Sequence, residues 1–363
     1  MHSKRAIDMA MNAQRLRVVI VCPATGESNN GNWRTATRWQ QLLRGTASVR
    51  IVQHWPDADA AQDDVMLALH ARKSAASIQA WHAQRGTRGL GVALTGTDIY
   101  PDISLDPVGM ASLVQASSLV VLQEQALQAL PAAHQHKARV IFQSCSQRQL
   151  LPKTTRHLRV VMVGHLREEK NPAMLWRATQ AIAPDAGILI DHIGHALDAG
   201  MAQHARSVAS ACPHYRWLQG LSHAATLQRI QRAHVLVHTS HSEGGAIVIS
   251  EAIRCGTPVL ATRIAGNVGL LGADYRGLVE PDDDVALAAR LMQCRTEQAR
   301  TEPGLLARCQ SQCQERAMLF DPTTEQLALQ GWLWALQASS QIAPASTAHP
   351  QHFMSRSSAN TPP

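Results

Sequence analysis

Glu243 and Glu251 have the most informative spacing in the sequence. Glu243 follows a short apolar run that ends at His238, and it precedes a helix-compatible stretch that contains Glu251. A helix makes 3.6 residues per turn, so two carboxylates about two turns apart can face one crevice at different depths. We predict that the helix begins near Gly245, where free N–H groups and the positive dipole end suit a diphosphate or a sugar hydroxyl. Gly244 and Gly245 would let the backbone approach that ligand.

Two further loops lie near predicted strand ends in the same half of the chain. The first runs from Val163 to Pro172 and contains Gly164, His165, Arg167 and Lys170. Solvent-facing ends of a turn are the alternative reading of its two cations. The second contains three glycines without an evident packing requirement, so its N–H groups could bind phosphate oxygens as a concave nest. Its candidate ligand-binding residues are Gly266, Asn267, Val268 and Gly269, with Gly272 as the third glycine.

Three loops in the first half of the chain also follow predicted strands, and two of them are cationic. We expect Asn32 or Thr35 to cap a helix on which Arg34 and Arg38 lie one turn apart, and Ser74 to cap the next helix. Together the loops predict a site for a small anion, although each could be ordinary helix capping. The candidate residues are Asn30, Gly31, Asn32, Arg34, His70, Arg72, Lys73, Ser74, Thr95, Thr97 and Asp98.

Short apolar runs that alternate with helix-compatible stretches must position these loops. This pattern favours parallel sheets with crossover helices, in which ligands bind outside the carboxyl ends of the strands. The strand candidates are 16–22, 49–52, 65–69, 91–94, 119–122 and 140–142, and then 158–163, 187–193, 215–218, 235–237 and 258–261. Helix candidates in the first half include 35–43, 74–84 and 107–116. The predicted fold class is therefore α/β, with two doubly wound, Rossmann-like domains facing each other across a cleft.

The pattern restarts near 151–155, where Leu-Pro-Lys-Thr-Thr interrupts the periodicity. We expect a flexible N-terminus at 1–14, a first domain at 15–152 and a second domain at 153–320. A Leu- and Trp-rich helix should follow within 321–338, centred on 325–336. The segment 339–363 is rich in Ser, Ala, Pro, Gln and Thr, so we predict a disordered tail.

Composition narrows the class of protein. The formal charge is +7 among 363 residues, which is compatible with an anionic ligand. Without a Lys/Arg run or a known recognition motif, the sequence does not indicate nucleic-acid binding. There is no membrane-length apolar run and no signal core, so we expect a cytoplasmic protein without a membrane contact. Seven scattered cysteines indicate reduced thiols rather than a metal site. We attribute the Asp57-Ala58-Asp59 sequence to a solvated turn, and we expect neither metal nor cofactor.

The stretch around Glu243 and Glu251 closely resembles the E-x7-E element of GT-B glycosyltransferases, including its S-x-S-E-G and E-A-x-x-x-G-x-P-V flanks. The resemblance implies that Glu243 holds the sugar and Glu251 the ribose of a nucleotide sugar. The 163–172 loop looks like the family's G-R-L-x-x-x-K loop, whose Arg and Lys neutralise the donor diphosphate. Lys170 matches its Lys, whereas His165 replaces its Arg and Arg167 stands two residues later. The family's G-G-x-P-E sequence lacks its Pro and Glu here.

Several motifs in combination are similar to the selenosugar synthases of selenoneine biosynthesis. These motifs are N-N-G-N-W-R-T-A, A-L-H-A-R-K-S, L-T-G-T-D-I-Y, H-S-E-G-G-A and G-N-V-G-L-L-G. The resemblance implies transfer of a sugar from a UDP-sugar such as UDP-N-acetylglucosamine to selenophosphate, with a 1-selenosugar as the final product. The second domain would then bind the donor and the first the acceptor, with Glu243, Lys170 and Arg167 as catalytic residues. A transferase for a hydroxyl acceptor and a non-catalytic nucleotide-sugar-binding module are the alternatives. Sequence leaves the donor base, the stereochemistry and the oligomeric state open.

Overall fold

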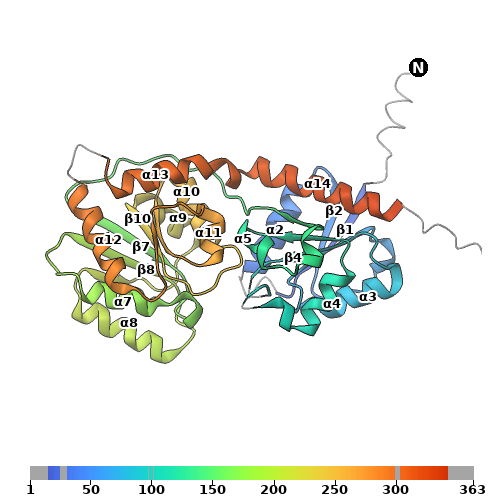
Figure 1. Ribbon diagram of the computed structural model, residues 1–363, viewed down its shortest axis with the longest axis horizontal. Coiled ribbons are helices and arrows are strands. Elements are labelled where there is room, and N and C mark those ends of the chain that lie inside the picture. The colour runs from blue at the N-terminus through green and yellow to red at the C-terminus, as the bar shows by residue number, and fades with distance from the viewer. Residues whose placement is uncertain (1–14, 25–30, 97, 101, 299–302, 342–363) are drawn as a thin grey trace, which may run out of the picture.

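The computed structural model describes residues 15–24, 31–96, 98–100, 102–298 and 303–341. Two parallel six-stranded sheets form the centres of two domains that lie side by side (Figure 1). The first has the order β2-β1-β3-β4-β5-β6, formed by Ala47–Val52, Leu16–Val21, Val65–Leu69, Leu90–Leu94, Ser118–Val121 and Ala138–Val140. The second has the order β12-β11-β10-β7-β8-β9, formed by Leu278–Val279, Val259–Thr262, Val235–His238, Leu158–Val163, Ile188–Ile193 and Tyr215–Trp217. The predicted α/β class with two doubly wound domains is confirmed.

The strands form where the apolar runs predict them, because a strand covered on both faces must be apolar at successive positions. All five residues of β3 and of β4 are buried. Among the described strands, β12 had no predicted counterpart, since a strand of two residues carries too little periodicity to be recognised, and β6 begins two residues before the predicted 140–142.

Helices connect the strands and cover the sheets. In the first domain they are α2 (Gly31–Leu43), α3 (Ala75–Arg85), α4 (Pro107–Gln115), α5 (Gln125–Ala129) and α6 (Ala132–Gln135). In the second they are α7 (Pro172–Gln180), α8 (Ala199–Ala211), α9 (His223–Arg232), α10 (Ile247–Arg254), α11 (Ala265–Leu271), α12 (Asp284–Glu297) and α13 (Leu305–Arg316). The final helix, α14, spans Pro322–Gln341 and is longer than the predicted 325–336.

Helix α14 leaves the second domain and packs on the first, as the red helix along the top of Figure 1 shows. Trp332 is fully buried, and its ring lies edge-on to that of Trp39 on α2 at a centroid distance of 5.8 Å. A Cβ atom at Gly91 of β4 would lie 2.5 Å from the Trp332 ring, so glycine is needed for this close packing. The C-terminal helix therefore completes the core of the N-terminal domain.

The segment 141–157 joins the two sheets and contains neither helix nor strand. Its residues Gln143 and Ser144 are buried, and they donate to Thr35 and Glu325 respectively. The connection thus packs between α2 and α14. In the described part of the chain, no helix combines the length and apolar character that crossing a membrane requires.

Candidate functional site

Lys170 and Glu243 meet at the point where the strand order of the second sheet reverses. The strands β7 and β10 are neighbours there, although one begins the domain and the other is its fourth strand. Loops after two such strands diverge to opposite sides of the sheet and leave a crevice between them. Lys170 ends a short 3₁₀ helix, Glu168–Lys170, after β7, and Glu243 lies between β10 and α10.

Glu243 is a nearly buried carboxylate with three donors on one oxygen. Its Oε1 atom accepts from Lys170 Nζ, from Ser240 Oγ at 2.7 Å and from His238 Nε2 at 3.1 Å. Its side chain is 11% exposed. Burial by itself would raise the pKa of Glu243, but the Lys170 charge and the His238 hydrogen bond outweigh burial and hold the pKa well below its usual value. The carboxylate is therefore charged throughout the neutral range.

Two glycines pack directly against Lys170 and Glu243. The stem of Lys170 lies over Gly164, where an added Cβ would be 3.5 Å from the lysine Cγ. Gly266 packs on Glu243 so closely that an added Cβ would lie 2.2 Å from the Glu243 carbonyl oxygen. The expectation that the 266–272 glycines have no packing role is therefore wrong for Gly266.

The predicted nest at 266–272 is also wrong as a conformation, because Ala265–Leu271 forms helix α11. The buried Asn267 side chain donates through Nδ2 to the Thr262 carbonyl at 2.9 Å, and so it closes the turn after β11. Val268 is only partly buried. Any phosphate contact here would come from N–H groups at the start of a helix rather than from a concave loop.

Glu251 has a separate partner. It lies on α10, and its Oε1 atom is 2.6 Å from Nε2 of His223, the first residue of α9. The Glu251 side chain is 6% exposed, whereas that of His223 is 51% exposed. The half-exposed imidazole of His223 thus covers the Glu251 carboxylate and separates it from solvent.

His165 occupies the position where the resemblance places an arginine. Its ring stacks on that of His195 at a centroid distance of 5.8 Å, and its Nδ1 accepts from the His195 N–H at 3.2 Å. Burial lowers the pKa of His165, and nearby positive charges lower it further. Those charges are led by Arg167 and include Lys170 and Arg34, the last of which belongs to α2 of the other domain. His165 is thus neutral near pH 7, and cationic residues of both domains surround it.

Arg167 contributes to the positive charge around His165. Its guanidinium is 3.7 Å from Glu169, and both side chains are about half exposed. The structure pairs Lys170 with Glu243, whereas the partner of Arg167 is Glu169.

Three glycines bring the two domains together. An added Cβ would lie 2.5 Å from Gly96 at Gly244, 2.7 Å from Leu122 at Gly245, and 1.8 Å from Gln123 at Gly269. Gly96, Leu122 and Gln123 all belong to the first domain. The described contacts of these glycines are therefore with the opposite domain, which the sequence interpretation of Gly244 and Gly245 did not foresee.

The loops of the first domain are connected by polar side chains. Thr95 Oγ1 donates to Asn32 Oδ1 at 2.5 Å, which joins the loop after β4 to the start of α2. The fully buried Asp98 accepts from the Ala71 N–H at 3.0 Å and from the Gly96 N–H at 2.9 Å. Asp98 therefore holds two strand-end loops together.

His70 lies beside Asp98 in the left-handed region, with a φ of 73°. Its Nδ1 accepts from the Lys73 N–H at 3.3 Å, which leaves Nε2 as the protonated nitrogen of a neutral ring. Burial lowers the pKa of His70, although the Asp98 charge opposes this effect. Its buried Nε2 has no hydrogen-bond partner among the described residues.

The remaining predicted residues of this domain have different surroundings. Arg72 lies 2.8 Å from Asp106, and Lys73 is exposed. Arg38 is paired with Glu325 at 3.0 Å, so it is not available for an anionic ligand as the sequence suggested.

Capping differs from prediction as well. Ser74 stands at the N-cap position of α3, but its buried hydroxyl donates to the Leu69 carbonyl at 2.6 Å. It makes no capping hydrogen bond to the N–H groups of α3. Helix α2 begins at Gly31, which places Thr35 inside the helix. Asn30 and Thr97 lie outside the described residues.

Sequence reasoning missed the residues that position the two glutamates. His238 ends the buried strand β10 and Ser240 follows two residues later, which is a signal that could have identified them. His223 lies 28 residues before Glu251, and nothing in the sequence pairs the two.

Comparison with known proteins agrees with this architecture. Residues 146–303 match the family model of the group 1 glycosyl transferases. No curated protein sequence matches the chain.

Solved structures resemble most of the chain. HepE of Anabaena, in complex with UDP and glucose, aligns over 88% of this chain and all of its own, with a TM-score of 0.66 and 16% identity. Sucrose-phosphate synthase from Thermosynechococcus elongatus aligns over 90% of this chain and all of its own, with a TM-score of 0.72 and 16% identity. A glycosyltransferase from Rickettsia africae gives a TM-score of 0.69 at 13% identity, over 91% of this chain and all of its own. The fold is therefore the GT-B architecture.

Proposed function

We propose that the protein is a glycosyltransferase that takes a sugar from a nucleotide diphosphate donor. The observation that carries this proposal is the charged Lys170–Glu243 pair at the strand crossover of the second domain. An ammonium and a carboxylate side by side suit a ligand that presents both phosphate oxygens and sugar hydroxyls. The family match over 146–303 covers this pair and supports the same activity.

The donor we propose is a UDP-sugar, since HepE of similar fold was solved with UDP and with UDP-glucose. Glu243 would accept hydrogen bonds from the sugar, and Glu251 from the ribose. Lys170 would turn from Glu243 toward the diphosphate, and Arg167 would approach it. The neutral His165 would donate a hydrogen bond to the diphosphate, whereas an arginine at this position would also contribute a positive charge.

For the acceptor we propose a small anion, and specifically selenophosphate, with UDP-N-acetylglucosamine as donor. Arg34 contributes positive charge at the His165 side of the cleft, and Arg72 and Lys73 follow β3 on the same domain. The buried His70 Nε2–H without a partner is a donor suited to an anionic oxygen. We propose that Asn32, Ser74, Thr95 and Asp98 also serve the acceptor, together with Asn30 and Thr97, as the sequence resemblance implies.

The proposed sugar transfer forms one bond and breaks one. Selenium attacks the anomeric carbon, and the bond from that carbon to the departing diphosphate oxygen breaks, so that UDP leaves with both bonding electrons. Water then cleaves the Se–P bond, which gives a 1-selenosugar and phosphate and would contribute to selenoneine biosynthesis. An anionic selenium nucleophile needs no strong general base, so the protein would act by placement and charge stabilisation.

The test is UDP release from UDP-N-acetylglucosamine, measured by chromatography with and without selenophosphate. We expect release only with selenophosphate, together with a product that shows the selenium isotope pattern by mass spectrometry. Glu243→Gln should reduce turnover by about tenfold to a hundredfold, because a charged hydrogen bond to the sugar is lost. Glu315→Gln on α13 removes an exposed carboxylate and is the matched control.

Two results would overturn parts of the proposal. Transfer to hydroxyl acceptors without any selenophosphate product would refute the acceptor assignment. Tight binding of the UDP-sugar without turnover on any acceptor would identify a binding module and refute the activity.

A further inference from the structure

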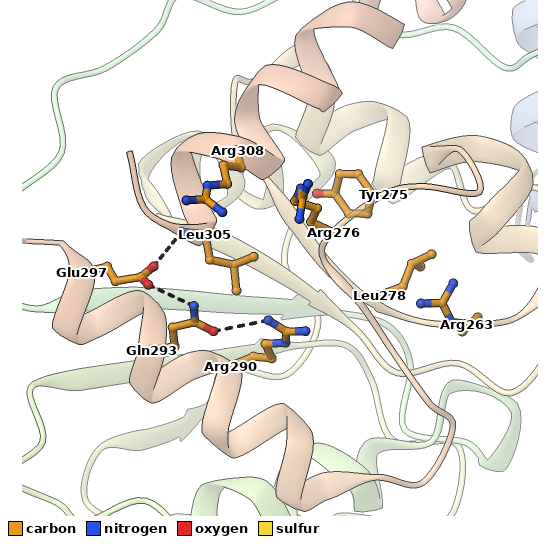
Figure 2. A pocket seen from close by; sticks show the side chains of 9 residues that line it. All are labelled: Arg263, Tyr275, Arg276, Leu278, Arg290, Gln293, Glu297, Leu305 and Arg308. Atoms are coloured by element: carbon orange, nitrogen blue, oxygen red, sulfur yellow. Dashed lines mark hydrogen bonds between the residues drawn. The ribbon is translucent and has the colours of Figure 1, made fainter. Parts of the chain in front are cut away.

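A separate cavity lies at the outer edge of the second domain, beside the edge strand β12. Its volume is about 270 Å³, and Figure 2 shows four arginines around it, Arg263, Arg276, Arg290 and Arg308. Arg263 directly follows β11, Arg276 lies two residues before β12, and the other two belong to helices α12 and α13. Neither Lys170 nor Glu243 lines this cavity, so the proposed donor site does not account for it.

The carboxylates nearby neutralise these arginines only in part. Glu297 is the acidic residue in the lining, and it accepts from the Leu305 N–H at 2.6 Å and from Gln293 at 2.9 Å. Glu280 pairs with Arg263 at 2.8 Å, with both side chains half exposed. When both carboxylates are counted against the four arginines, the described residues leave an excess of two positive charges at the cavity.

The other arginines have weak or neutral partners. Arg290 Nη1 donates to Gln293 Oε1 and Arg308 Nε donates to the Pro303 carbonyl, each at 3.3 Å. Within the described residues, the Arg276 side chain makes no ion pair. Neutral acceptors leave the charge uncompensated, so the guanidinium groups repel one another until an anion binds between them.

We propose that this cavity binds a small ligand that carries a dianionic phosphoryl group. Guanidinium groups present forked N–H donors that match phosphate oxygens, and the excess of two charges equals the charge of a phosphate monoester. The volume accommodates such a group with a small organic substituent rather than a dinucleotide. The site is distinct from the donor cleft, and its ligand would be either free phosphate or a phosphorylated metabolite.

Isothermal titration of the full chain with inorganic phosphate and, separately, with glucose 6-phosphate tests the proposal. We expect the double variant Arg290→Gln/Arg308→Gln to raise the Kd by about tenfold, an effect reduced from that of buried pairs by solvent screening. Gln293→Glu places a carboxylate beside Arg290 on the surface of α12 and should weaken binding to a similar degree without removing any arginine.

Two controls locate the binding. Arg232→Gln on α9 removes an exposed arginine that does not line the cavity, and it should leave the Kd unchanged. Lys170→Met disables the donor site and should also leave cavity binding unchanged, so the two proposals fail separately. Binding of the monoester alone, or of both probes, with this dependence supports the site. No binding of either probe, or binding that Gln293→Glu and the double variant do not weaken, overturns it.

Discussion

Glu325 is a fully buried carboxylate, and replacing it with glutamine should destabilise the N-terminal domain. Its Oε2 atom is 3.0 Å from Arg38 Nε and accepts from the Ser144 N–H at 2.7 Å, while Oε1 accepts from Trp39 Nε1 at 2.8 Å. These donors belong to α2 and to the segment between the sheets, so one side chain of α14 joins three parts of the fold.

The size of the stability loss follows from the interactions that a glutamine amide cannot make. An uncharged amide removes the ion pair with Arg38, and its NH₂ group must face one of the existing donors. Breaking a buried pair from one side costs about 3–5 kcal/mol. The Arg38 side chain is 20% exposed and can regain some solvation, so we place the loss for Glu325→Gln near 3 kcal/mol. For a domain of this size, that corresponds to a fall of about 6–12 °C in Tm.

Urea and thermal unfolding monitored by tryptophan emission would measure this loss. Because the chain has two domains, the transition of the N-terminal domain must be fitted separately. Glu315→Gln, an exposed change of the same chemistry, is the control and should stay within about 0.5 kcal/mol of the parent protein. Combining Glu325→Gln with Arg38→Met should recover part of the loss, since the arginine is then no longer stranded. A Glu325→Gln protein as stable as the Glu315→Gln control would refute the reasoning.

Other changes test the site and the linker. Gly266→Ala should lower UDP-sugar turnover by about tenfold, because its Cβ would meet the Glu243 backbone at 2.2 Å. The control Gly331→Ala on α14, where an added Cβ has nothing within 4 Å, should leave activity intact and gain up to about 1 kcal/mol in stability. Equal activity of the two variants would contradict the packing argument. Burial lowers the pKa of Lys153 to about 8, so the native state disfavours the charged side chain. The parent protein should therefore gain stability as the pH rises from about 8 toward the unfolded pKa near 10.4. Lys153→Met should therefore stabilise by about 2 kcal/mol at pH 7, a gain that thermal unfolding should show to disappear near pH 10.

The contact between Lys170 and Glu243 was predictable from local sequence. Lys170 and Glu243 each stand in a loop directly after an apolar run, and the ends of parallel strands must meet at one edge of a sheet. The residues that position Glu243, namely His238 and Ser240, are also local in the chain, and their strand-end location would have revealed them.

Distant pairings were decided only by the tertiary structure. Periodicity specifies which face of an element is buried, but it does not specify which other element covers that face. Thus the sequence predicted a Trp- and Leu-rich C-terminal helix, and only packing places Trp332 and Glu325 against the first domain. The same holds for Gly269, where Gln123 of the first domain packs so closely that a side chain would not fit.

Amino-acid order alone determined the α/β class, the positions of the strands along the chain and the loops that carry the candidate site. These features depend on neighbours within a few residues. The convergence of four arginines on one cavity and the approach of His223 to Glu251 came from the fold, because only chain folding brings residues so far apart in sequence within reach.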